Sequence, residues 1–461
     1  MKKKCSALLL CLALLVTVIS GCKPNSGIKL NPNDPITVTM WHNYGGQMQS
    51  TMDALIDEFN NTIGRERGII VSVTAVSAIK DVESNLQLIA NGDPGAAEMP
   101  DITIAYPKTA LFLNEAGLLA ELDGQFTAEE MDAYLPQFMA EGRLPDGKLY
   151  VFPIAKSTEV LFVNRTLFDR FAAATGVTLE SLATFEGIAA AAVKYAAWTD
   201  ERTPDVPNDG GTFYTADSWF SVAMVGTAQL GGTFVEPEQL RTDAESFHRI
   251  WDVTTTPALL GGYAVSDGYS SDLSKTGEIV CSTGSTAGIL FYGNSVTYPD
   301  NTIEAVEYTV LPFPVFEGGE KIALQRGAGM VVAKSTPEKE YAAALFLKWV
   351  TQPEQNMRFV SSTGYLPVTK AAFEINMTSE MENVEIENVR KLLEAATLMF
   401  NEYDFIMAPN YDQYDAMSKV FESSLKQAMR DGRETVLAAD AADALREAAA
   451  VSETLFLHFI Q

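Results

Sequence analysis

Apolar positions alternate between two periods over the first hundred residues of the folded part of this chain. Short apolar runs at 36–41, 69–76 and 101–106 have the length and composition of buried strands. Between them, residues 48–59 and 82–90 repeat apolar side chains every three or four positions, which is typical of amphipathic helices. This order of strands and helices predicts a parallel sheet with helices on its faces.

A second group of elements is expected after residue 149. Residues 149–164 form a long apolar stretch, and Pro153 and the polar group Lys156-Ser157-Thr158 interrupt it, which indicates that the chain leaves one sheet and enters another. The segments beyond predict a second α/β lobe followed by a mostly helical region from about 380. The expected helices are 167–174, 183–198, 217–230, 338–351, 413–427 and 438–456, and the expected strands are 278–292, 306–313 and 324–333.

Length and charge agree with two lobes in an exported protein. A chain of 461 residues, 47% of them hydrophobic, exceeds the usual size of one core. The formal net charge of −27 repels nucleic acid and offers anionic lipid headgroups no basic patch. We therefore expect no nucleic-acid partner and no membrane contact through the folded surface.

The N-terminus predicts export. Lysines at positions 2–4 precede an apolar run at 7–19, and Ser20-Gly21 stand directly before Cys22, which is the layout of a secretory signal peptide over residues 1–21. An uncleaved anchor helix is the rival, but the polar stretch that follows contains no stop-transfer pattern. Ile19 to Cys22 also resembles the bacterial lipobox, which implies cleavage before Cys22, acylation of its thiol and a flexible spacer over 22–35. The mature chain then keeps Cys281 as its one free thiol and has no intramolecular disulfide.

Several segments resemble the family 1 extracellular solute-binding proteins of bacterial ABC importers, especially the glycerol-3-phosphate-binding and sugar-binding members. The matching segments are Val38-Thr39-Met40-Trp41-His42, Glu58-Phe59-Asn60, Pro100-Asp101-Ile102, Val160-Leu161-Phe162-Val163-Asn164 with Leu167-Phe168, and Thr363-Gly364-Tyr365-Leu366-Pro367-Val368. The resemblance implies a periplasmic-binding-protein-like (type II) fold, in which two α/β lobes are joined by crossing segments and a ligand is bound in the cleft between them. We expect lobe 1 to contain 36–155 and about 305–352, and lobe 2 to contain about 156–304 and 353–461.

Aromatic and polar residues at predicted strand ends are the first candidate ligand contacts. Trp41, His42 and Tyr44 lie where the first strand ends before Gly45-Gly46, and Tyr106 ends the third strand. Open α/β sheets present ligands at such ends. An aromatic ring there can stack on a sugar, and Tyr or His can bind its hydroxyls. The alternative is that Trp41 caps the core and His42 is an ordinary solvated histidine.

Five further candidates come from the second lobe and the crossing segments. Ser157 interrupts an apolar strand, and the resemblance places it near a ligand-contacting serine of the glycerol-3-phosphate binders. Trp219 either stacks on ligand or starts an apolar core helix. Ser285 belongs to a small, polar loop that is otherwise a surface turn, and Gly327 leaves room for a close approach on a crossing strand. Tyr365 lies in the best family match and is the strongest candidate.

The ligand class stays open because the chain departs from the glycerol-3-phosphate binders that it resembles. Tyr106 is followed by Pro107 where they carry a carboxylate, and no arginine for phosphate is evident around 405–414. Arg326 or Lys156 are the possible substitutes. A neutral sugar, oligosaccharide or polyol is the leading expectation, with glycerol-3-phosphate or a glycerophosphodiester as the alternative. The aromatic residues Tyr106, Tyr292 and Tyr403 equally suit a choline-type cation.

An exported enzyme is the rival class of function. Three histidines, His42, His248 and His458, have no zinc-binding spacing, and the chain contains no Gly-x-Ser-x-Gly elbow or phosphate-binding glycine loop. Carboxylate pairs for a glycoside hydrolase remain an alternative because 60 residues are acidic. A purely structural or adhesive surface lipoprotein is a further rival.

Together these patterns predict a monomeric binding protein without enzymatic activity, metal or cofactor. The family resemblance implies a small-molecule solute and the permease subunits of an ABC transporter as its partners. A lipid on Cys22 is expected to attach it to the outer face of the cytoplasmic membrane or to keep it in the periplasm or cell envelope.

Overall fold

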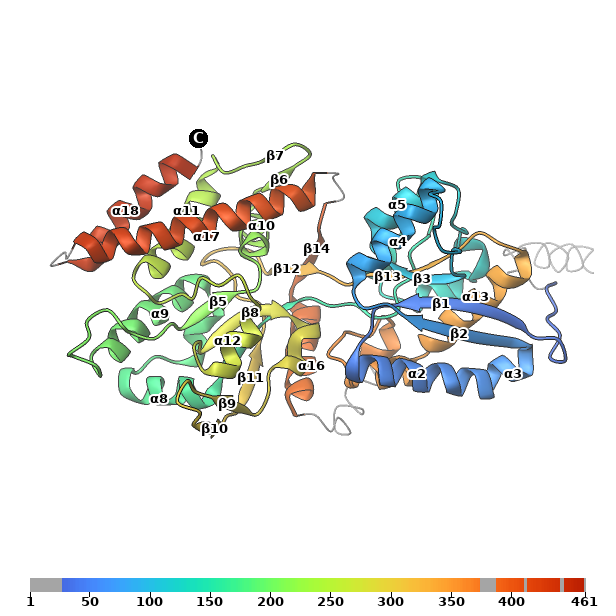
Figure 1. The fold of residues 1–461 in the computed structure, drawn as a ribbon, viewed down its shortest axis with the longest axis horizontal. Helices are drawn as coiled ribbons and strands as arrows, with labels where there is room; N and C mark the ends of the chain where they lie inside the picture. The colour runs from blue at the N-terminus through green and yellow to red at the C-terminus, as the bar shows by residue number, and fades with distance from the viewer. Residues whose placement is uncertain (1–26, 374–386, 410–412, 440–442, 460–461) are drawn as a thin grey trace, which may run out of the picture. The chain divides into compact units, whose positions relative to one another are not determined.

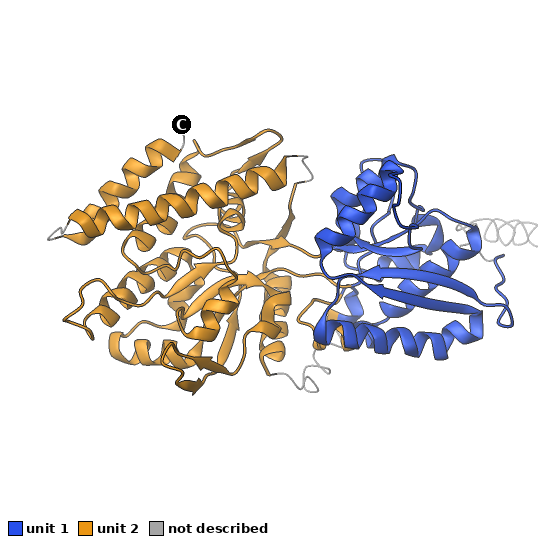
Figure 2. Cartoon of the chain, in the orientation of Figure 1, with its two compact units in different colours: residues 1–154, 328–356, 368–372 blue, residues 155–327, 357–367, 373–461 orange. Residues whose placement is uncertain are grey.

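A computed structural model describes residues 27–373, 387–409, 413–439 and 443–459, and these residues divide into two compact units (Figure 2). Unit 1 contains the chain up to Ile154, with Ala328–Asn356 and Val368–Ala372. Unit 2 contains Ala155–Gly327, Met357–Pro367 and the chain from Phe373 onward. The predicted signal peptide and Cys22 lie outside the described residues. Within those residues, no helix is long and apolar enough to cross a membrane.

Unit 1 is built on a four-stranded sheet in the order β13-β3-β1-β2 (Figure 1). Strands β1 (Ile36–His42), β2 (Ile69–Ala75) and β3 (Ile102–Ala105) are parallel, as the sequence predicts, and β13 (Gly329–Val332) is added antiparallel to β3. The helices of this unit and the segment that follows it are α2 (Gly46–Asn61), α3 (Ile63–Arg67), α4 (Ile79–Asn91), α5 (Pro107–Glu115), η1 (Asp123–Gln125), α6 (Ala128–Asp132), α7 (Pro136–Glu141), α13 (Pro337–Val350) and α14 (Pro353–Ser361).

Apolar periodicity explains how helix α2 packs. Its buried residues recur every three or four positions, at Met52, Leu55, Ile56 and Phe59. The ring of Phe59 lies 5.1 Å from that of Phe346 on α13, measured between centroids, so early and late parts of the sequence share one core.

Because β1, β2 and β3 are parallel, their carboxyl ends lie at one edge of the sheet, which we call the unit 1 edge. His42, Ala75 and Ala105 are the last residues of these strands.

Unit 2 contains a second four-stranded sheet, in the order β11-β4-β8-β5. Strand β4 (Glu159–Asn164) is buried along its whole length and runs antiparallel to β11 (Tyr308–Leu311) and β8 (Cys281–Ser285), while β5 (Tyr214–Ala216) is parallel to β8. The other elements of the unit before residue 387 are α8 (Arg165–Thr175), η2 (Leu179–Ala183), α9 (Phe185–Asp200), α10 (Trp219–Gln229), β6 (Val235–Glu236), β7 (Gln239–Leu240), α11 (Glu245–Leu259), α12 (Ser270–Thr276), η3 (Thr286–Phe291), β9 (Ser295–Thr297), β10 (Ile303–Ala305) and β12 (Ile322–Gln325).

The C-terminal region is mostly helical, with one strand that the sequence analysis did not anticipate. Its helices are α16 (Glu387–Glu402), α17 (Tyr414–Ala439) and α18 (Ala444–Phe459). Strand β14 (Asp404–Met407) follows α16 in the sequence and pairs in parallel with β12. Rings from α11, α17 and α18 pack together, and Figure 1 shows α17 and α18 side by side. Strand β14 has only four residues, and so short an apolar run cannot be distinguished by periodicity from the neighbouring helical segments.

Two strand pairings move the unit boundaries from their expected positions. Residues 305–327, expected in lobe 1, belong to unit 2 because β11 pairs with β4 and β12 pairs with β14. The single strand expected at 324–333 is divided at Gly327, with β12 in unit 2 and β13 in unit 1. The strand expected at 278–292 ends at Ser285, whose hydroxyl accepts a hydrogen bond from the Ala287 amide and caps the 3-10 helix η3.

Candidate functional site

Paired backbone segments bring three of the candidate regions together in unit 2. Ser157 and Arg326 exchange both of their backbone hydrogen bonds, at 2.9 and 2.8 Å. Lys156 and Leu366 do the same, at 3.1 and 2.6 Å. Because 157, 326 and 366 are far apart in sequence, this ladder is what places Ser157 beside Gly327 and beside the turn that contains Tyr365.

A glycine turn adds the Ser285 loop to this group. Gly364 has φ +78°, and a Cβ atom there would lie 2.4 Å from Ile289 Cγ2 and 2.7 Å from the carbonyl oxygen of Thr286. The Thr286 amide in turn donates to the carbonyl of Thr158 at 2.9 Å. The amino end of β4 and the carboxyl ends of β8 and β5 thus form one sheet edge, which we call the unit 2 edge.

The unit 2 edge exposes some of its candidate residues and encloses others. Ser285, Gly327 and Tyr365 are partly exposed, whereas Ser157 is only 4% exposed. Trp219 follows β5 at the same edge, but it is 1% exposed and its ring lies 5.8 Å from Tyr214 and 5.7 Å from Tyr263. Trp219 is therefore a core residue, which is the second of the two alternatives that the sequence left open, and it does not form a stacking wall.

The cations of the unit 2 edge are held by protein acceptors. Arg326 Nη1 donates to Glu159 Oε1 at 2.5 Å, and Glu159 is buried. Burial raises the pKa of the Glu159 carboxyl, and the charge of Arg326 opposes that shift. The ammonium of Lys156, which is also buried, donates to the carbonyl of Gly327. Glu159 was missed from the sequence, although a carboxylate that starts an apolar strand was the visible sign of a buried ion pair.

The four candidates of unit 1 gather at the unit 1 edge. Trp41 and His42 end β1, Tyr44 follows, and Tyr106 caps α5 directly after β3, whose register pairs Trp41 with Thr103. Trp41 is half-buried and Tyr106 is 40% exposed, so both can meet a ligand. His42 and Tyr44 are buried, with ring centroids 5.0 Å apart, which contradicts the alternative of a solvated histidine.

His42 is held as a neutral ring. The backbone amide of Tyr44 donates to its Nδ1 at 3.2 Å, so the hydrogen of the imidazole is on Nε2. Burial lowers the pKa of His42, and the carboxylate of Asp53 opposes this effect. Among the described residues, neither His42 Nε2 nor the buried Asp53 Oδ1 has a hydrogen-bond partner.

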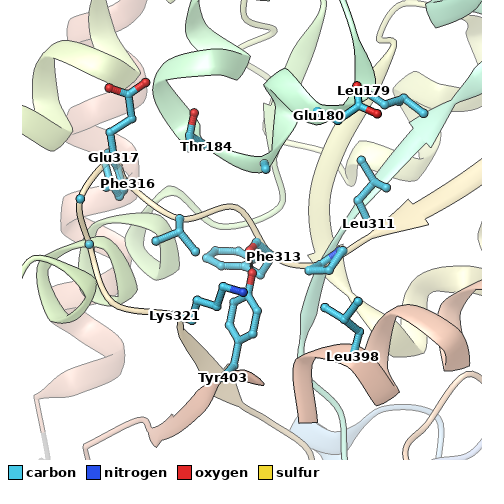
Figure 3. Close-up of a pocket in the computed structure, with 15 residues that line it drawn as sticks. Leu179, Glu180, Thr184, Leu311, Phe313, Phe316, Glu317, Lys321, Leu398 and Tyr403 are labelled. Atoms are coloured by element: carbon cyan, nitrogen blue, oxygen red, sulfur yellow. Dashed lines mark hydrogen bonds between the residues drawn. The ribbon is translucent and has the colours of Figure 1, made fainter. Parts of the chain in front are cut away.

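A separate pocket of about 560 Å³ lies in unit 2 (Figure 3). Its lining includes Tyr403, which the sequence analysis considered for a choline-type cation, but none of the candidate residues at the two sheet edges. Apolar side chains, including Leu311, Phe313 and Leu398, surround it, and Tyr403 OH donates to the carbonyl of Phe313 at 2.9 Å. Glu180, Thr184 and Lys321 add polar groups to a lining that is mostly apolar. Residues of the two sheet edges do not line this pocket, so we do not place the solute there.

Acidic and sulfur ligands are not arranged for a metal ion in the part of the chain that the structure describes: no group of three or more His, Cys, Asp or Glu side chains is suitably placed. Cys281 is buried in β8, and burial raises the pKa of its thiol well above the usual range. Cys281 is therefore an inert core residue rather than a nucleophile.

Comparison with known proteins gives one family. The family model described as "Bacterial extracellular solute-binding protein" matches residues 54–385, well over half of the chain. The chain is 25% identical over 354 residues to the sn-glycerol-3-phosphate-binding periplasmic protein UgpB of Rhizobium meliloti (strain 1021), covering 72% of this chain and 75% of that protein. It is 22% identical over 430 residues to UgpB of Agrobacterium fabrum, covering 85% of this chain and 93% of that protein.

Solved structures show the same fold. A cyclic alpha-maltosyl-1,6-maltose binding protein from Arthrobacter globiformis matches with a TM-score of 0.67 and 19% identity, over 92% of this chain and 99% of that chain. UgpB from Mycobacterium tuberculosis, in complex with glycerophosphocholine, matches with a TM-score of 0.63 and 18% identity over the same shares. The architecture is thus the periplasmic-binding-protein-like fold expected from the sequence. The chain belongs to the bacterial extracellular solute-binding protein family, and it is a solute-binding protein of the kind that serves ABC importers.

Proposed function

We propose that this protein captures an uncharged, hydroxyl-rich solute, either a carbohydrate or a polyol, outside the cytoplasm and delivers it to an ABC permease. The observation that supports this ligand class is the state of the two cations at the unit 2 edge. Arg326 is paired with the buried Glu159, and Lys156 is bonded to the carbonyl of Gly327. A phosphate dianion needs a guanidinium or several N–H donors, and it would compete here with a buried carboxylate. Hydroxyl groups meet no such penalty.

Partly exposed groups at both sheet edges suit the recognition of a sugar. Tyr365, Ser285 and Gly327 lie at the unit 2 edge, and Trp41 and Tyr106 lie at the unit 1 edge. Aromatic faces pack on the apolar side of a sugar ring, while hydroxyls and backbone groups bind its polar rim. We assign these five residues to ligand binding, with His42, Tyr44 and Ser157 as buried supports behind them.

Glycerol-3-phosphate or a glycerophosphodiester is the second candidate ligand. It is favoured by the names of the sequence relatives from Rhizobium and Agrobacterium and by the glycerophosphocholine complex of the mycobacterial protein. In this chain the phosphate would meet a guanidinium that is already paired with the buried Glu159, whose negative charge would oppose it.

A thermal-shift screen separates these ligand classes. The panel contains mono- and oligosaccharides, polyols, glycerol-3-phosphate and glycerophosphocholine. A ligand at a hundred times its Kd stabilises the folded state by about 2.7 kcal/mol, which raises Tm by several degrees. We expect a neutral carbohydrate to give the largest shift and mass spectrometry to recover it unaltered. Stabilisation by the phosphate compounds alone would reverse the assignment, and turnover of the ligand would identify an enzyme.

Attachment and assembly form part of the same proposal. The signal peptide at 1–21 directs export, the lipid on Cys22 and the spacer at 22–35 hold the protein at the membrane surface, and the mature chain acts as a monomer without a metal or cofactor. The family and the related proteins are binding proteins, which supports the expectation that the chain is not an enzyme.

Cys22→Ala tests the lipid. The variant lacks the only thiol at the lipobox position, so cells labelled with an alkyne fatty acid should show labelled wild-type protein and unlabelled variant. Cys281→Ala is the matched control and should label like the wild type, because Cys281 is buried in β8. Continued labelling of the Cys22 variant would remove the lipid from the proposal.

A further inference from the structure

Tyr269 is an exposed aromatic residue beside the unit 2 edge that the sequence analysis did not select. It caps helix α12 and is 75% exposed, more than any other large apolar or aromatic side chain in the described part of the chain. Single exposed aromatic residues are common on protein surfaces. The position and the support of Tyr269 distinguish it from an ordinary surface tyrosine.

A carboxylate at the end of β5 fixes the position of Tyr269. The amide of the next residue, Ser270, donates to Asp217 Oδ1 at 2.8 Å, and Asp217 follows the last residue of β5. Asp217 is exposed. A Cβ atom on Gly284 would lie 2.5 Å from Asp217 Oδ2, so the absence of a side chain on β8 makes room for this carboxylate. Tyr269 and Asp217 therefore lie together next to Ser285.

The backbone under Tyr269 is held rigidly. The hydroxyl of Ser270 lies 2.8 Å from Tyr292 OH, which also lies 2.9 Å from Ser282 Oγ on β8. Tyr292 is buried, and its ring stacks on Phe162 of β4 with centroids 4.2 Å apart. An aromatic ring presented on a fixed backbone loses little conformational entropy when it binds a ligand.

The unit 2 edge is wider than one sugar ring. Tyr269 and Asp217 lie beside β5, whereas Ser157 lies at the start of β4, and β8 separates the two strands. Two strand spacings correspond to about 10 Å. A ligand that reaches from Tyr365 and Gly327 to Tyr269 must therefore contain more than one hexose unit.

We infer that Tyr269 and Asp217 form a distal subsite that gives this protein a preference for oligosaccharides over monosaccharides. The inference rests on the proposed function and names the ligand length within it. The face of Tyr269 supports a second or later sugar ring, and the exposed carboxylate of Asp217 accepts hydrogen bonds from its hydroxyls. The residue thus takes the stacking role that was expected of the buried Trp219.

Isothermal titration with saccharides of one to four hexose units, including maltooligosaccharides, tests the inference on the purified protein. We expect affinity to rise with length in the wild type. Tyr269→Ala should weaken binding of the longest tight-binding saccharide by about tenfold and should change binding of the shortest one by less than about threefold. Tyr269→Phe should keep most of the affinity, because the ring and not the hydroxyl makes the contact.

Phe291→Ala provides a matched control. Phe291 is another exposed aromatic residue, 54% exposed, and it lies beside Lys275 near the opposite end of α12. Its removal should leave all affinities unchanged. Equal affinities of wild type and Tyr269→Ala for every saccharide would overturn the subsite and leave the proposed function intact. A wild type that binds no saccharide but is stabilised by glycerophosphocholine would overturn both the subsite and the carbohydrate assignment.

Discussion

At the residue scale, the unit 1 edge includes a histidine whose ring is hydrogen-bonded by a backbone amide. His42 accepts from the Tyr44 amide through Nδ1, while Nε2 and the nearby Asp53 Oδ1 have no partner among the described residues. A buried donor without an acceptor lowers the free energy of unfolding. The neutral ring is nevertheless the stable form, because burial lowers the pKa of His42 below that of an exposed histidine.

This pKa shift predicts that stability falls in mild acid. The unfolded chain protonates His42 near pH 6.5, whereas the folded chain resists protonation until a lower pH. Below about pH 6.5 the unfolded state binds more protons, so the free energy of unfolding decreases as the pH falls towards the folded-state pKa. Urea unfolding at pH 7.5 and 5.5 measures the effect.

His42→Asn keeps an oxygen that can accept from the Tyr44 amide but removes the titrating ring. The variant should lose less stability than the wild type between the two pH values. An identical loss in both proteins would show that other groups cause the acid sensitivity.

At the scale of single elements, short connections set the geometry of the unit 2 edge. The Gly364 turn packs on η3, and the bridges of Ser157 to Arg326 and of Lys156 to Leu366 hold three separate segments in register. None of these segments is a long helix or strand. The positions of Tyr365 and Ser285 therefore depend on close backbone packing.

Gly364→Ala should disturb this packing. Alanine is unfavourable at the φ of +78° that Gly364 adopts, and its Cβ atom would lie 2.7 Å from the Thr286 carbonyl oxygen. We therefore expect a loss of about 2–4 kcal/mol in the free energy of unfolding. Gly318→Ala is the matched control: its φ is +74°, but its Cβ would meet nothing within 4 Å, so only the backbone cost of about 1 kcal/mol should remain. Equal losses in the two variants, measured by urea unfolding, would contradict tight packing at Gly364.

At the scale of the whole molecule, the chain divides into two units that each contain a sheet with candidate residues at one edge. Helices α17 and α18 complete the larger unit, and late strands complete both sheets: β13 is added to unit 1 and β11 to unit 2. Neither unit is a continuous stretch of sequence. Folding of each unit therefore requires residues more than 200 positions apart to meet.

The family resemblance predicts that one solute contacts residues of both units. Trp41→Ala in unit 1 and Tyr365→Ala in unit 2 should then each weaken binding of the same solute by about tenfold, because each removes an aromatic contact. Isothermal titration with the solute found by the thermal-shift screen measures both affinities, and melting curves confirm that the variants fold. Phe112→Ala, an exposed aromatic change on α5, is a control for unit 1. Loss of affinity in the Tyr365 variant alone would restrict the site to unit 2.

Local sequence patterns were enough to predict the class of the fold and most of its elements. The periods of apolar residues predicted β1, α2, β2, α4 and β3 within a few residues, because each of these elements buries one continuous face whose spacing is written in the local sequence. The segments around Trp41, Asn164 and Tyr365 were also sufficient to identify the family, and the match to the family model confirmed it. Of the candidates that the sequence placed at strand ends, Trp41 is half-buried and Tyr106 is exposed, so neither ring is enclosed in the core.

Contacts between distant segments, which the sequence does not reveal, determine which polar and aromatic residues are buried and which are exposed. Trp219 and Tyr269 are both aromatic residues at the start of helices, and nothing in their neighbouring residues reveals that one is enclosed by Tyr214 and Tyr263 while the other faces solvent. The pairing of Glu159 with Arg326, 167 positions apart, and the pairing of β12 with β14 likewise depend on which segments meet in space. Local periodicity specifies the face that an element buries, but the partner that covers that face comes from a distant part of the chain.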